Sequence, residues 1–542
     1  MNINFAEIPN HQNLFLDYLY EFENVSSFYF YNFRKKDQYS DIFRKIFERE
    51  NPNRSLLKKI ILEQYSCFEN LSNKTSRNLE ILDDKKTLFV ITGQQLGIFG
   101  GPLYTFYKII TAIKLSSLLN ERYDDYYFVP LFWMESDDHD FEEVNSINVL
   151  NDSNNLISIF YKEINQEEEL RESVGTIVFD EAINNVYSKL ESELRNTEFK
   201  SKLLEKLKSI YTVGKTFKQA FRDLLFDFFD KYGLIIFDPQ DARVKNLLKP
   251  IFFNEIKNFR EHTQKLVSVS AALEERYHAQ VKIKPVNLFY TLDNNRYSIE
   301  PDENFFKLKR KRKQFTFEEI LSEIENHPER FSPNVLLRPI TQDYLFNTAF
   351  YIAGPSEISY FAQVNSLYEF FNLVPPIIYP RASATILEKH LTNFIEKYNL
   401  DIKDIFFGEE HLKYKVFKVL SEINIDDVFN ESNKKIEIVF DDIKQELFRI
   451  DKTLSDSVNK YKERVSHLLN DLQNKSKKLQ ETKFETVIKQ LKKLSNLLYP
   501  NQNLQEREIN FIYFYNKYGP EIIDRIFEEI NIQDFEHKII LL

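Results

Sequence analysis

The clearest pattern along the chain is an alternation of short apolar runs with longer stretches of helical spacing. Continuous apolar runs at 88–91, 126–133, 234–237, 350–353 and 377–379 predict buried strands. Several stretches between them place apolar side chains three and four positions apart, as helices that pack on a sheet do. Strands and helices that alternate in this way predict an α/β fold.

Other segments carry weaker versions of the same two patterns. Residues 1–80 have mainly helical spacing, and Pro130 predicts that its strand lies at an edge of the sheet or ends there. Apolar runs predict further strands at Val174–Phe179, Gln280–Ile283 and Val335–Leu337, and helical spacing predicts helices at Phe217–Tyr232 and Ala384–Tyr398.

A long series of apolar residues near the C-terminus repeats every three or four positions. The repeat covers residues 436–472, its register shifts between Leu479 and Phe484, and it resumes at 487–498. Sustained spacing of this kind predicts an α-helical coiled coil. The slip and the polar residues Asn474–Lys478 predict a helical hairpin. We expect the coiled coil to join two copies of the chain in a homodimer, with a single antiparallel hairpin in a monomer as the alternative.

Glycines gather at one strand-to-helix turn. The chain has only 10 glycines, and Gly93, Gly97, Gly100 and Gly101 lie between a predicted strand and a helix that Pro102 opens. Glycine permits positive φ and a close approach of the backbone to a ligand, and N–H groups at such a turn point toward an anion. The spacing matches neither a P-loop nor a GxGxxG fingerprint. We expect a ligand-facing loop, with a ligand-free turn as the alternative.

Composition and charge narrow the classes of partner. The 542 residues carry a net charge of −11, which disfavours nucleic acid, because phosphate contacts need lysine and arginine. The basic run Lys307–Lys313 is expected to be a solvated hairpin or loop. Cys67 is the only cysteine, so an internal disulfide and a cysteine-based zinc site are excluded. With no signal peptide and no long apolar span, we expect a cytoplasmic protein without a membrane partner.

Three groups of polar residues lie where a small-molecule site would form. They are the glycine loop with Tyr104 and Lys108, the DDHD run at 137–140, and a group of residues between Arg338 and Arg381. In the glycine loop, Tyr104 and Lys108 lie one helical turn apart, so both can project toward one pocket. The DDHD run follows a predicted strand, where open α/β sheets bind ligands. The alternatives are helix capping by Asp137 or Asp138, a surface position for Lys108, and a buried ion pair such as Arg338 with Asp343. The candidates are His139, Asp138 and Lys108 for catalysis, and Gly93, Gln94, Gln95, Gly97, Gly100, Gly101, Tyr104, Asp137, Asp140, Arg338, Gln342, Asp343, Gly354, Glu357, Tyr360, Gln363 and Arg381 for binding nucleotide or substrate, with no metal ligand assigned.

Five sequence blocks carry a resemblance to a known family. They are TGQQLGIFGGPLYTFYKIITAIKL, VPLFWMESDDHDFEEVN, SPNVLLRPITQDYLFNTAFYIAGPSEISYFAQV, Pro380–Arg381 and LQEREINFIYFYNKYG, in this order along the chain. They resemble the bacillithiol biosynthesis cysteine-adding enzyme family, BshC. The resemblance implies a Rossmann-type core like that of class I aminoacyl-tRNA synthetases, with connecting insertions and a C-terminal coiled coil. We expect N-terminal helices and the first half of the core at 1–150, core continuation with insertions at 151–330, the second half of the core at 331–400, a coiled-coil arm at 401–500 and a docking segment at 501–542.

The same resemblance implies a function, namely ligation of L-cysteine to the amine of glucosaminyl malate in the last step of bacillithiol biosynthesis. We expect ATP to drive the reaction, and whether Mg²⁺ accompanies it stays open. The activation route stays open because the chain has neither a HIGH tetrad nor a KMSKS loop. Arg338 and Arg381 are expected to bind the malate carboxylates, and Asp343 or Glu357 the amine. A non-catalytic nucleotide-binding or assembly protein that acts through its coiled coil is the alternative.

Overall fold

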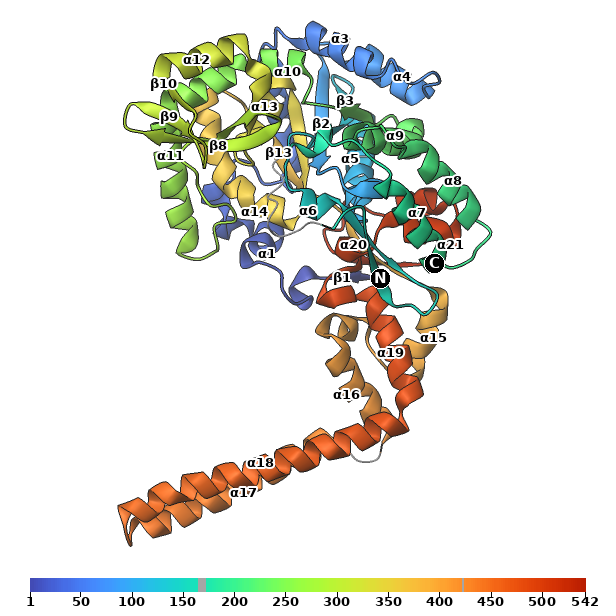
Figure 1. The fold of residues 1–542 in the computed structure, drawn as a ribbon, viewed down its shortest axis with the longest axis vertical. Coiled ribbons are helices and arrows are strands. Elements are labelled where there is room, and N and C mark those ends of the chain that lie inside the picture. The colour runs from blue at the N-terminus through green and yellow to red at the C-terminus, as the bar shows by residue number, and fades with distance from the viewer. Residues whose placement is uncertain (164–171, 422–423) are drawn as a thin grey trace. The chain divides into compact units, whose positions relative to one another are not determined.

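The computed structural model describes residues 1–163, 172–421 and 424–542 (Figure 1). These residues form two compact units. The larger unit comprises Met1–Asp152, Leu156–Thr385 and Gln505–Ile540, and the smaller unit comprises Ser153–Asn155, Ile386–Leu504 and Leu541–Leu542. The chain therefore leaves the larger unit after residue 385 and returns to it at residue 505.

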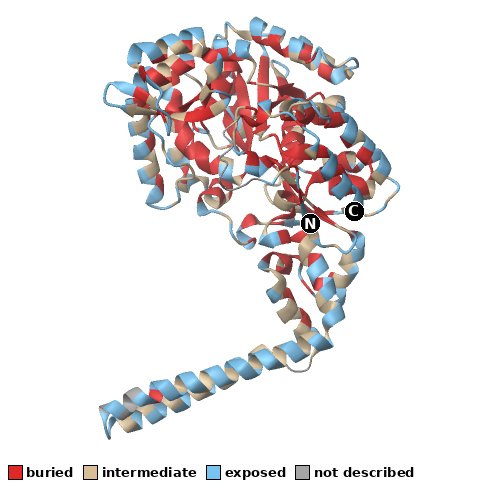
Figure 2. Cartoon of the chain, in the orientation of Figure 1, coloured by how far each residue is buried: buried red, intermediate tan, exposed pale blue. Residues whose placement is uncertain are grey.

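The core of the larger unit is a five-stranded parallel sheet with strand order β13-β12-β2-β3-β6 (Figure 1). Figure 2 shows buried residues concentrated in this sheet and in the helices next to it, as is typical of parallel strands covered on both faces. The five predicted strands are therefore confirmed. They are β2 (Thr87–Gln94), β3 (Tyr127–Met134), β6 (Ile235–Phe237), β12 (Thr348–Ala353) and β13 (Ile377–Pro380).

Pro130 lies in the interior of β3, and β3 is not an edge strand, because β6 pairs with it. The predicted edge position is therefore wrong. The sheet tolerates the proline because pairing between β3 and β6 begins only at Leu131, one residue further on.

Helices connect and cover the strands of the larger unit. The helix α5 (Tyr104–Arg122) joins β2 to β3 and packs on both. The N-terminal segment is mainly helical, as predicted, and α9 begins at the predicted residue with a capping box between Thr216 and Gln219. No helix in the described part of the chain is both long enough and apolar enough to cross a membrane. The other α-helices up to residue 364 are α1 (Asn13–Tyr20), α2 (Tyr39–Glu48), α3 (Arg54–Gln64), α4 (Asn73–Glu80), α6 (Phe141–Val144), α7 (Ala182–Glu193), α8 (Lys200–Ile210), α9 (Phe217–Phe229), α10 (Ala242–Leu247), α11 (Lys249–Glu274), α12 (Phe317–Asn326), α13 (Arg338–Leu345) and α14 (Pro355–Val364).

A second five-stranded sheet is antiparallel, with strand order β10-β9-β8-β7-β11. The basic run Lys307–Lys313 forms its exposed β9–β10 hairpin, as predicted. Its strands are β7 (Leu288–Leu292), β8 (Asn295–Asp302), β9 (Phe305–Leu308), β10 (Gln314–Thr316) and β11 (Phe331–Pro333). A two-stranded hairpin, β4 (Ser146–Leu150) and β5 (Leu156–Phe160), is separate.

Three strand predictions in this part of the chain are wrong. Residues 335–337 form the turn before α13, and the strand lies earlier, at β11. Val174–Thr176 is a 3₁₀ turn. Residues 280–283 pair with no strand of the described residues, because the side chain of Gln363 bonds both the N–H and the C=O of Val281, at 3.0 and 2.9 Å.

Within the larger unit, the C-terminal segment Gln505–Ile540 packs on the core helices through aromatic side chains. Phe511 is fully buried and stacks on Phe106 of α5 with a centroid distance of 4.2 Å. The strand β15 pairs with β1 in a sheet of order β1-β15-β14. Because β14 occupies the start of the predicted helix 384–398, that helix begins only at α15. The elements are α20 (Gln505–Glu508), α21 (Phe511–Tyr518), α22 (Ile522–Glu529), β15 (His537–Leu541), β1 (Asn2–Ile3), β14 (Ser383–Leu387) and α15 (Lys389–Lys397).

The smaller unit contains a long antiparallel helical hairpin, α17 (Ile425–Phe448) and α18 (Lys452–Lys483), with α16 (Glu409–Leu420) and α19 (Glu485–Leu498). An ion pair at 2.6 Å joins Lys477 to Asp426 across the hairpin. The hairpin is confirmed, but the predicted position of its turn is wrong. The turn lies at Arg449–Asp451, where the side chain of Asp451 caps α18, and the slip near Phe484 is only the break between α18 and α19.

Candidate functional site

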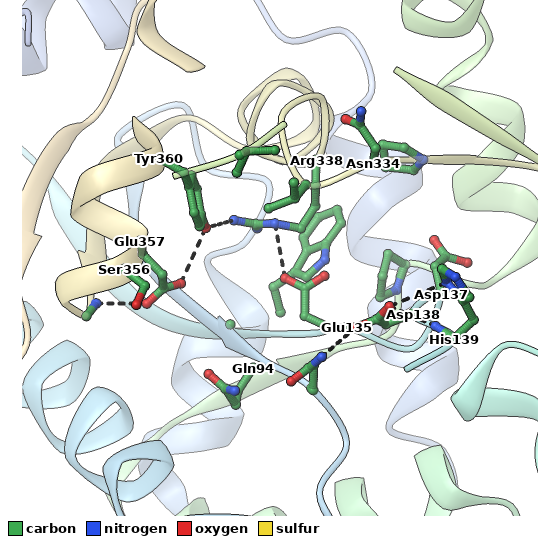
Figure 3. Close-up of a pocket in the computed structure, with 18 of the residues that line it drawn as sticks. Gln94, Glu135, Asp137, Asp138, His139, Asn334, Arg338, Ser356, Glu357 and Tyr360 are labelled. Atoms are coloured by element: carbon green, nitrogen blue, oxygen red, sulfur yellow. Dashed lines mark hydrogen bonds and ion pairs between the residues drawn. The ribbon is translucent and has the colours of Figure 1, made fainter. Parts of the chain in front are cut away.

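A cavity of about 420 Å³ lies at the carboxyl-terminal edge of the parallel sheet, within the larger unit (Figure 3). Open α/β sheets bind ligands at this edge, where loops from neighbouring strands converge. Each strand contributes lining residues at or just beyond its last residue. They are Gly93–Gln95 at β2, Glu135 and Asp137–His139 after β3, Pro239 after β6, Gly354–Glu357 after β12 and Arg381 after β13.

Lys108 lines the cavity and connects the end of β2 to the start of α14. Its Nζ lies 2.6 Å from a carboxylate oxygen of Glu357 and donates to the backbone oxygen of Gly93 and to Oε1 of Gln94, both at 2.8 Å. The side chain is only 4% exposed, so Lys108 is not the surface lysine of the alternative interpretation. Three acceptors occupy its three N–H bonds, and the lysine therefore holds the end of β2 against the start of α14.

Glu357 remains ionised despite its position in the interior. Burial alone would raise the pKa of Glu357, but Lys108 and the Gly354 N–H hold it below its usual value. The N–H of Gly354 donates at 2.8 Å and the hydroxyl of Tyr351 at 2.7 Å. The Glu357 carboxylate is thus bonded on both oxygens, which fixes the first turn of α14 at the wall of the cavity.

Glu135 and Arg338 form an ion pair in the middle of the cavity wall, with Nε and Oε1 3.1 Å apart (Figure 3). The Arg338 guanidinium also donates to Gln342 and Tyr351 at 3.0 Å, and to Tyr360 at 3.2 Å. Burial raises the pKa of Glu135 to about 7, despite the lowering effect of Arg338. The alternative of a buried ion pair therefore holds for Arg338, with Glu135 as its partner in place of Asp343.

The DDHD run faces the cavity with its first three residues, and each has a polar partner from another element. Asp137 forms an ion pair with the buried Lys245 of α10. Asp138 accepts a 2.7 Å hydrogen bond from Gln95 and lies 3.8 Å from Arg296 of β8. His139 Nδ1 lies 3.3 Å from the Arg296 guanidinium. Figure 3 shows this group on one side of Glu135, with Glu357 on the other.

Arg381 and Tyr104 line the cavity at the end near Gly354. A 2.6 Å ion pair joins Arg381 to the fully buried Glu506, and the guanidinium carbon lies 5.4 Å from the centroid of the Tyr104 ring. Tyr104 accepts a 3.1 Å hydrogen bond from Gln94. The structure therefore brings together the predicted residues Gly93, Gln94, Gln95, Tyr104, Lys108, Asp137, Asp138, His139, Arg338, Gly354, Glu357, Tyr360 and Arg381.

Seven predicted site residues do not line the cavity, which contradicts the expected position of each. A Cβ on Gly97 would lie 2.5 Å from Cα of Gly101, so the turn is folded tightly on itself, and Asn510 bonds the Gly101 carbonyl at 2.6 Å. The acid that caps α6 is Asp140, so the alternative that Asp137 or Asp138 caps this helix is wrong. Asp343 is buried, and its two carboxylate oxygens accept hydrogen bonds from Gln342 and Tyr368. The seven are Gly97, Gly100, Gly101, Asp140, Gln342, Asp343 and Gln363.

The sequence analysis did not single out five charged residues that line the cavity, namely Glu135, Lys282, Lys284, Arg296 and Arg507. Glu135 directly precedes the DDHD run and follows the same strand, so strand-end position was a usable signal. Arg507 lies in the block LQEREINFIYFYNKYG, which the sequence analysis interpreted as part of a docking segment. Arg296 reaches the cavity from the antiparallel sheet, and no local pattern marks it.

No group of three or more His, Cys, Asp or Glu side chains within the described residues is arranged to hold a metal ion. The acids nearest to such a role are Asp137 and Asp138. Lys245 neutralises the first, while Gln95 and Arg296 partner the second. These two carboxylates can supply at most part of a Mg²⁺ coordination shell.

Comparison with known proteins identifies the family that the sequence blocks predicted. Two family models match, the bacillithiol biosynthesis BshC N-terminal Rossmann-like domain at residues 1–382 and the BshC C-terminal coiled-coil domain at residues 384–542. A "Putative cysteine ligase BshC" from Salinibacter ruber is 33% identical and covers 97% of this chain and 96% of its own length. A protein of the same name from Chloroherpeton thalassium is also 33% identical, with 97% and 96% covered.

A solved structure of a "putative arginyl t-RNA synthetase" from Campylobacter jejuni covers 81% of this chain and 98% of its own at 11% identity, and its TM-score of 0.21 carries no argument about the fold.

The two family models together cover nearly the whole chain, and the relatives match it over almost their entire length. The chain therefore belongs to the bacillithiol biosynthesis BshC family.

Proposed function

We propose that the chain is a ligase that joins the carboxyl group of L-cysteine to the amine of glucosaminyl malate, which completes bacillithiol. The observation that carries this proposal is a single cavity that contains a carboxyl group able to exchange a proton near neutral pH, Glu135, together with a set of fixed cations and acids. The names of the relatives, which describe them as cysteine ligases, support the same reaction.

Amide formation makes a specific demand on the cavity. The amine nitrogen attacks the activated carbonyl carbon of cysteine, a C–N bond forms, the bond to the activating group breaks, and the nitrogen loses a proton. Glu135 is our candidate for the general base that takes this proton, because its pKa of about 7 leaves it partly ionised and ready to accept at neutral pH. The Arg338 guanidinium, 3.1 Å away, fixes the carboxylate in one orientation.

ATP is the proposed co-substrate, since a free carboxylate does not acylate an amine without activation. The His139 and Arg296 side of the cavity offers N–H donors suited to phosphate oxygens. Asp137 and Asp138 lie on the same side. We propose that a Mg²⁺ ion, if the reaction uses one, arrives with the nucleotide and takes most of its ligands from phosphate and water.

We propose a second copy of the chain as the protein partner, joined through the hairpin of α17 and α18. Exposed apolar residues lie one helical turn apart on both helices, with Val439 53% and Ile443 43% exposed on α17, and Leu468 68% and Leu472 55% exposed on α18. An isolated two-helix hairpin covers only one apolar seam. A second hairpin would bury these side chains as a coiled coil does.

The direct test incubates purified protein with ATP, L-cysteine and glucosaminyl malate and follows bacillithiol by mass spectrometry. We expect bacillithiol with stoichiometric cleavage of ATP, and loss of product when Glu135 is replaced by Gln. A folded protein that binds ATP but forms no product with these three substrates contradicts the ligase proposal. Unchanged bacillithiol in cells that carry the His139→Ala or Lys108→Ala protein would favour the non-catalytic alternative instead.

A further inference from the structure

Arg507 stands out among the cationic side chains of the cavity. It is half-buried in α20, and among the described residues its guanidinium has neither a hydrogen bond nor an ion pair. The neighbouring cations are neutralised, Arg381 by Glu506 at 2.6 Å and Lys108 by Glu357 at 2.6 Å. This end of the cavity therefore holds one guanidinium that makes no ion pair with a described residue, and Glu506 and Glu508 act on it only at longer range.

Nearby groups respond to this charge in a consistent direction. Burial lowers the pKa of Arg507, and the proximity of Arg381 lowers it further. Burial also lowers the pKa of His11 to about 4, and the positive charge of Arg507 is the second largest cause of this lowering. The Nε2 atom of His11 is buried and has no hydrogen-bond partner in the described part of the chain. An anion placed here would relieve the repulsion between the two arginines.

Tyr104 adds a directed donor beside Arg507. Its hydroxyl accepts from Gln94 at 3.1 Å, and within the described residues its own hydrogen has no acceptor. Burial raises the pKa of Tyr104 to about 12, although Arg507 and Arg381 oppose the rise, so the hydroxyl keeps its proton at neutral pH. A neutral donor and an unpaired guanidinium thus converge on one volume of the cavity.

We propose that Arg507 and Tyr104 form an oxyanion subsite that takes a carboxylate or phosphate group of a substrate. The proposal deepens the ligase function and rests on it only for the choice of substrate. It also replaces the expected carboxylate clamp of Arg338 and Arg381. Arg338 is committed to Glu135 and Arg381 to Glu506, so neither guanidinium has a free edge for a two-point contact with a new carboxylate, whereas Arg507 does.

Binding of three probes tests the subsite and identifies the source of the oxyanion. Isothermal titration of L-malate, ATP and L-cysteine is compared between the wild-type protein, Arg507→Gln, Arg507→Lys and Tyr104→Phe. We expect Arg507→Gln to weaken binding of one probe by roughly 10- to 100-fold, the range expected for a lost charge-assisted contact. Arg507→Lys and Tyr104→Phe should each lose less. Arg525→Gln is the matched control, since it removes the same charge from an exposed position on α22.

Each result has one meaning. A selective loss of L-malate binding assigns the subsite to the malyl carboxylates, a selective loss of ATP binding assigns it to phosphate, and a selective loss of L-cysteine binding assigns it to the amino-acid carboxylate. Equal affinity of Arg507→Gln and wild type for all three probes overturns the subsite, as does a wild type that binds none of them. Urea unfolding midpoints verify that each variant is folded, and Tyr104→Phe tests the subsite without removing a charge.

The binding assay also separates this proposal from the ligase proposal. Arg507-dependent binding in a protein without turnover would contradict the ligase function and leave the subsite intact. Conversely, an active ligase whose KM values for all three substrates are unchanged in Arg507→Gln would contradict the subsite alone.

Discussion

The ammonium nitrogen of Lys108 lies 2.6 Å from a carboxylate oxygen of Glu357, and the two side chains are 4% and 16% exposed. Lys108 belongs to α5, which follows β2, and Glu357 to α14, which follows β12. The pair therefore joins two strand-to-helix turns from distant parts of the sequence at the wall of the cavity. Its contribution to stability can be separated from any contribution to turnover.

Replacement of Lys108 by Met should destabilise the protein by about 3–5 kcal/mol, because it leaves the Glu357 carboxylate buried without a cation. Chemical unfolding followed by circular dichroism measures the loss. The double variant Lys108→Met with Glu357→Gln is the matched control. It removes both charges and should recover part of the stability. A single variant as stable as wild type would show that solvent reaches Glu357 and that the cross-link contributes little.

The pH dependence of stability should reveal Glu135. Its pKa in the folded chain is about 7, against a usual value of 4.5, so the folded state binds the proton more tightly than the unfolded state. Its contribution to stability is therefore greatest at low pH, falls as the pH rises from 4.5 to about 7, and is constant above that window. Glu135→Gln should remove this part of the pH dependence, measured as the difference in unfolding free energy between pH 5 and pH 8.

Turnover should depend on the same group in the opposite direction. A general base acts only when ionised, so the ligase rate should rise with pH and level off above about 7. Glu135→Gln should lower kcat by roughly 10²-fold or more and abolish this rise. Asp140→Asn is the control, because Asp140 lies outside the cavity lining. A Glu135→Gln protein with the wild-type pH profile would remove Glu135 from the proton transfer.

The parallel sheet could be predicted from the sequence because its strands are uninterrupted apolar runs, whereas short strands such as Phe331–Pro333 depend on partners far away in the chain. The same distinction applies to the cavity. Asp138 and Gly354 follow strands and were found from position alone, but Arg296 arrives from another sheet. The prediction of a ligand-facing glycine loop was only partly correct, because a compact turn and a ligand loop both require glycine. Gly93 lines the cavity, whereas Gly97, Gly100 and Gly101 do not.

His139 offers a test of turnover with little effect on the fold, because its side chain is 33% exposed and its ring lies 5.5 Å from that of Phe289. His139→Ala should change the free energy of unfolding by less than about 1 kcal/mol. If the ring contacts the activated substrate, kcat should fall by roughly 10²-fold. His278→Ala, at a side chain 76% exposed and outside the cavity lining, is the matched control and should leave kcat unchanged. Equal rates for both variants would exclude a catalytic role for His139.

The exposed apolar residues of the hairpin predict the oligomeric state. Leu468 and Leu472 are 68% and 55% exposed on α18 and lie one turn apart, so a second hairpin can cover both. Light scattering after size-exclusion chromatography should give wild type a mass near twice 65.0 kDa. The double variant Leu468→Glu and Leu472→Glu should give a single chain, since two carboxylates cannot be buried there without partners. Asn470→Glu, exposed on the same helix between the two leucines, adds charge without removing apolar contact and should remain a dimer. A monomeric wild type would instead support the alternative of a hairpin that pairs only with itself.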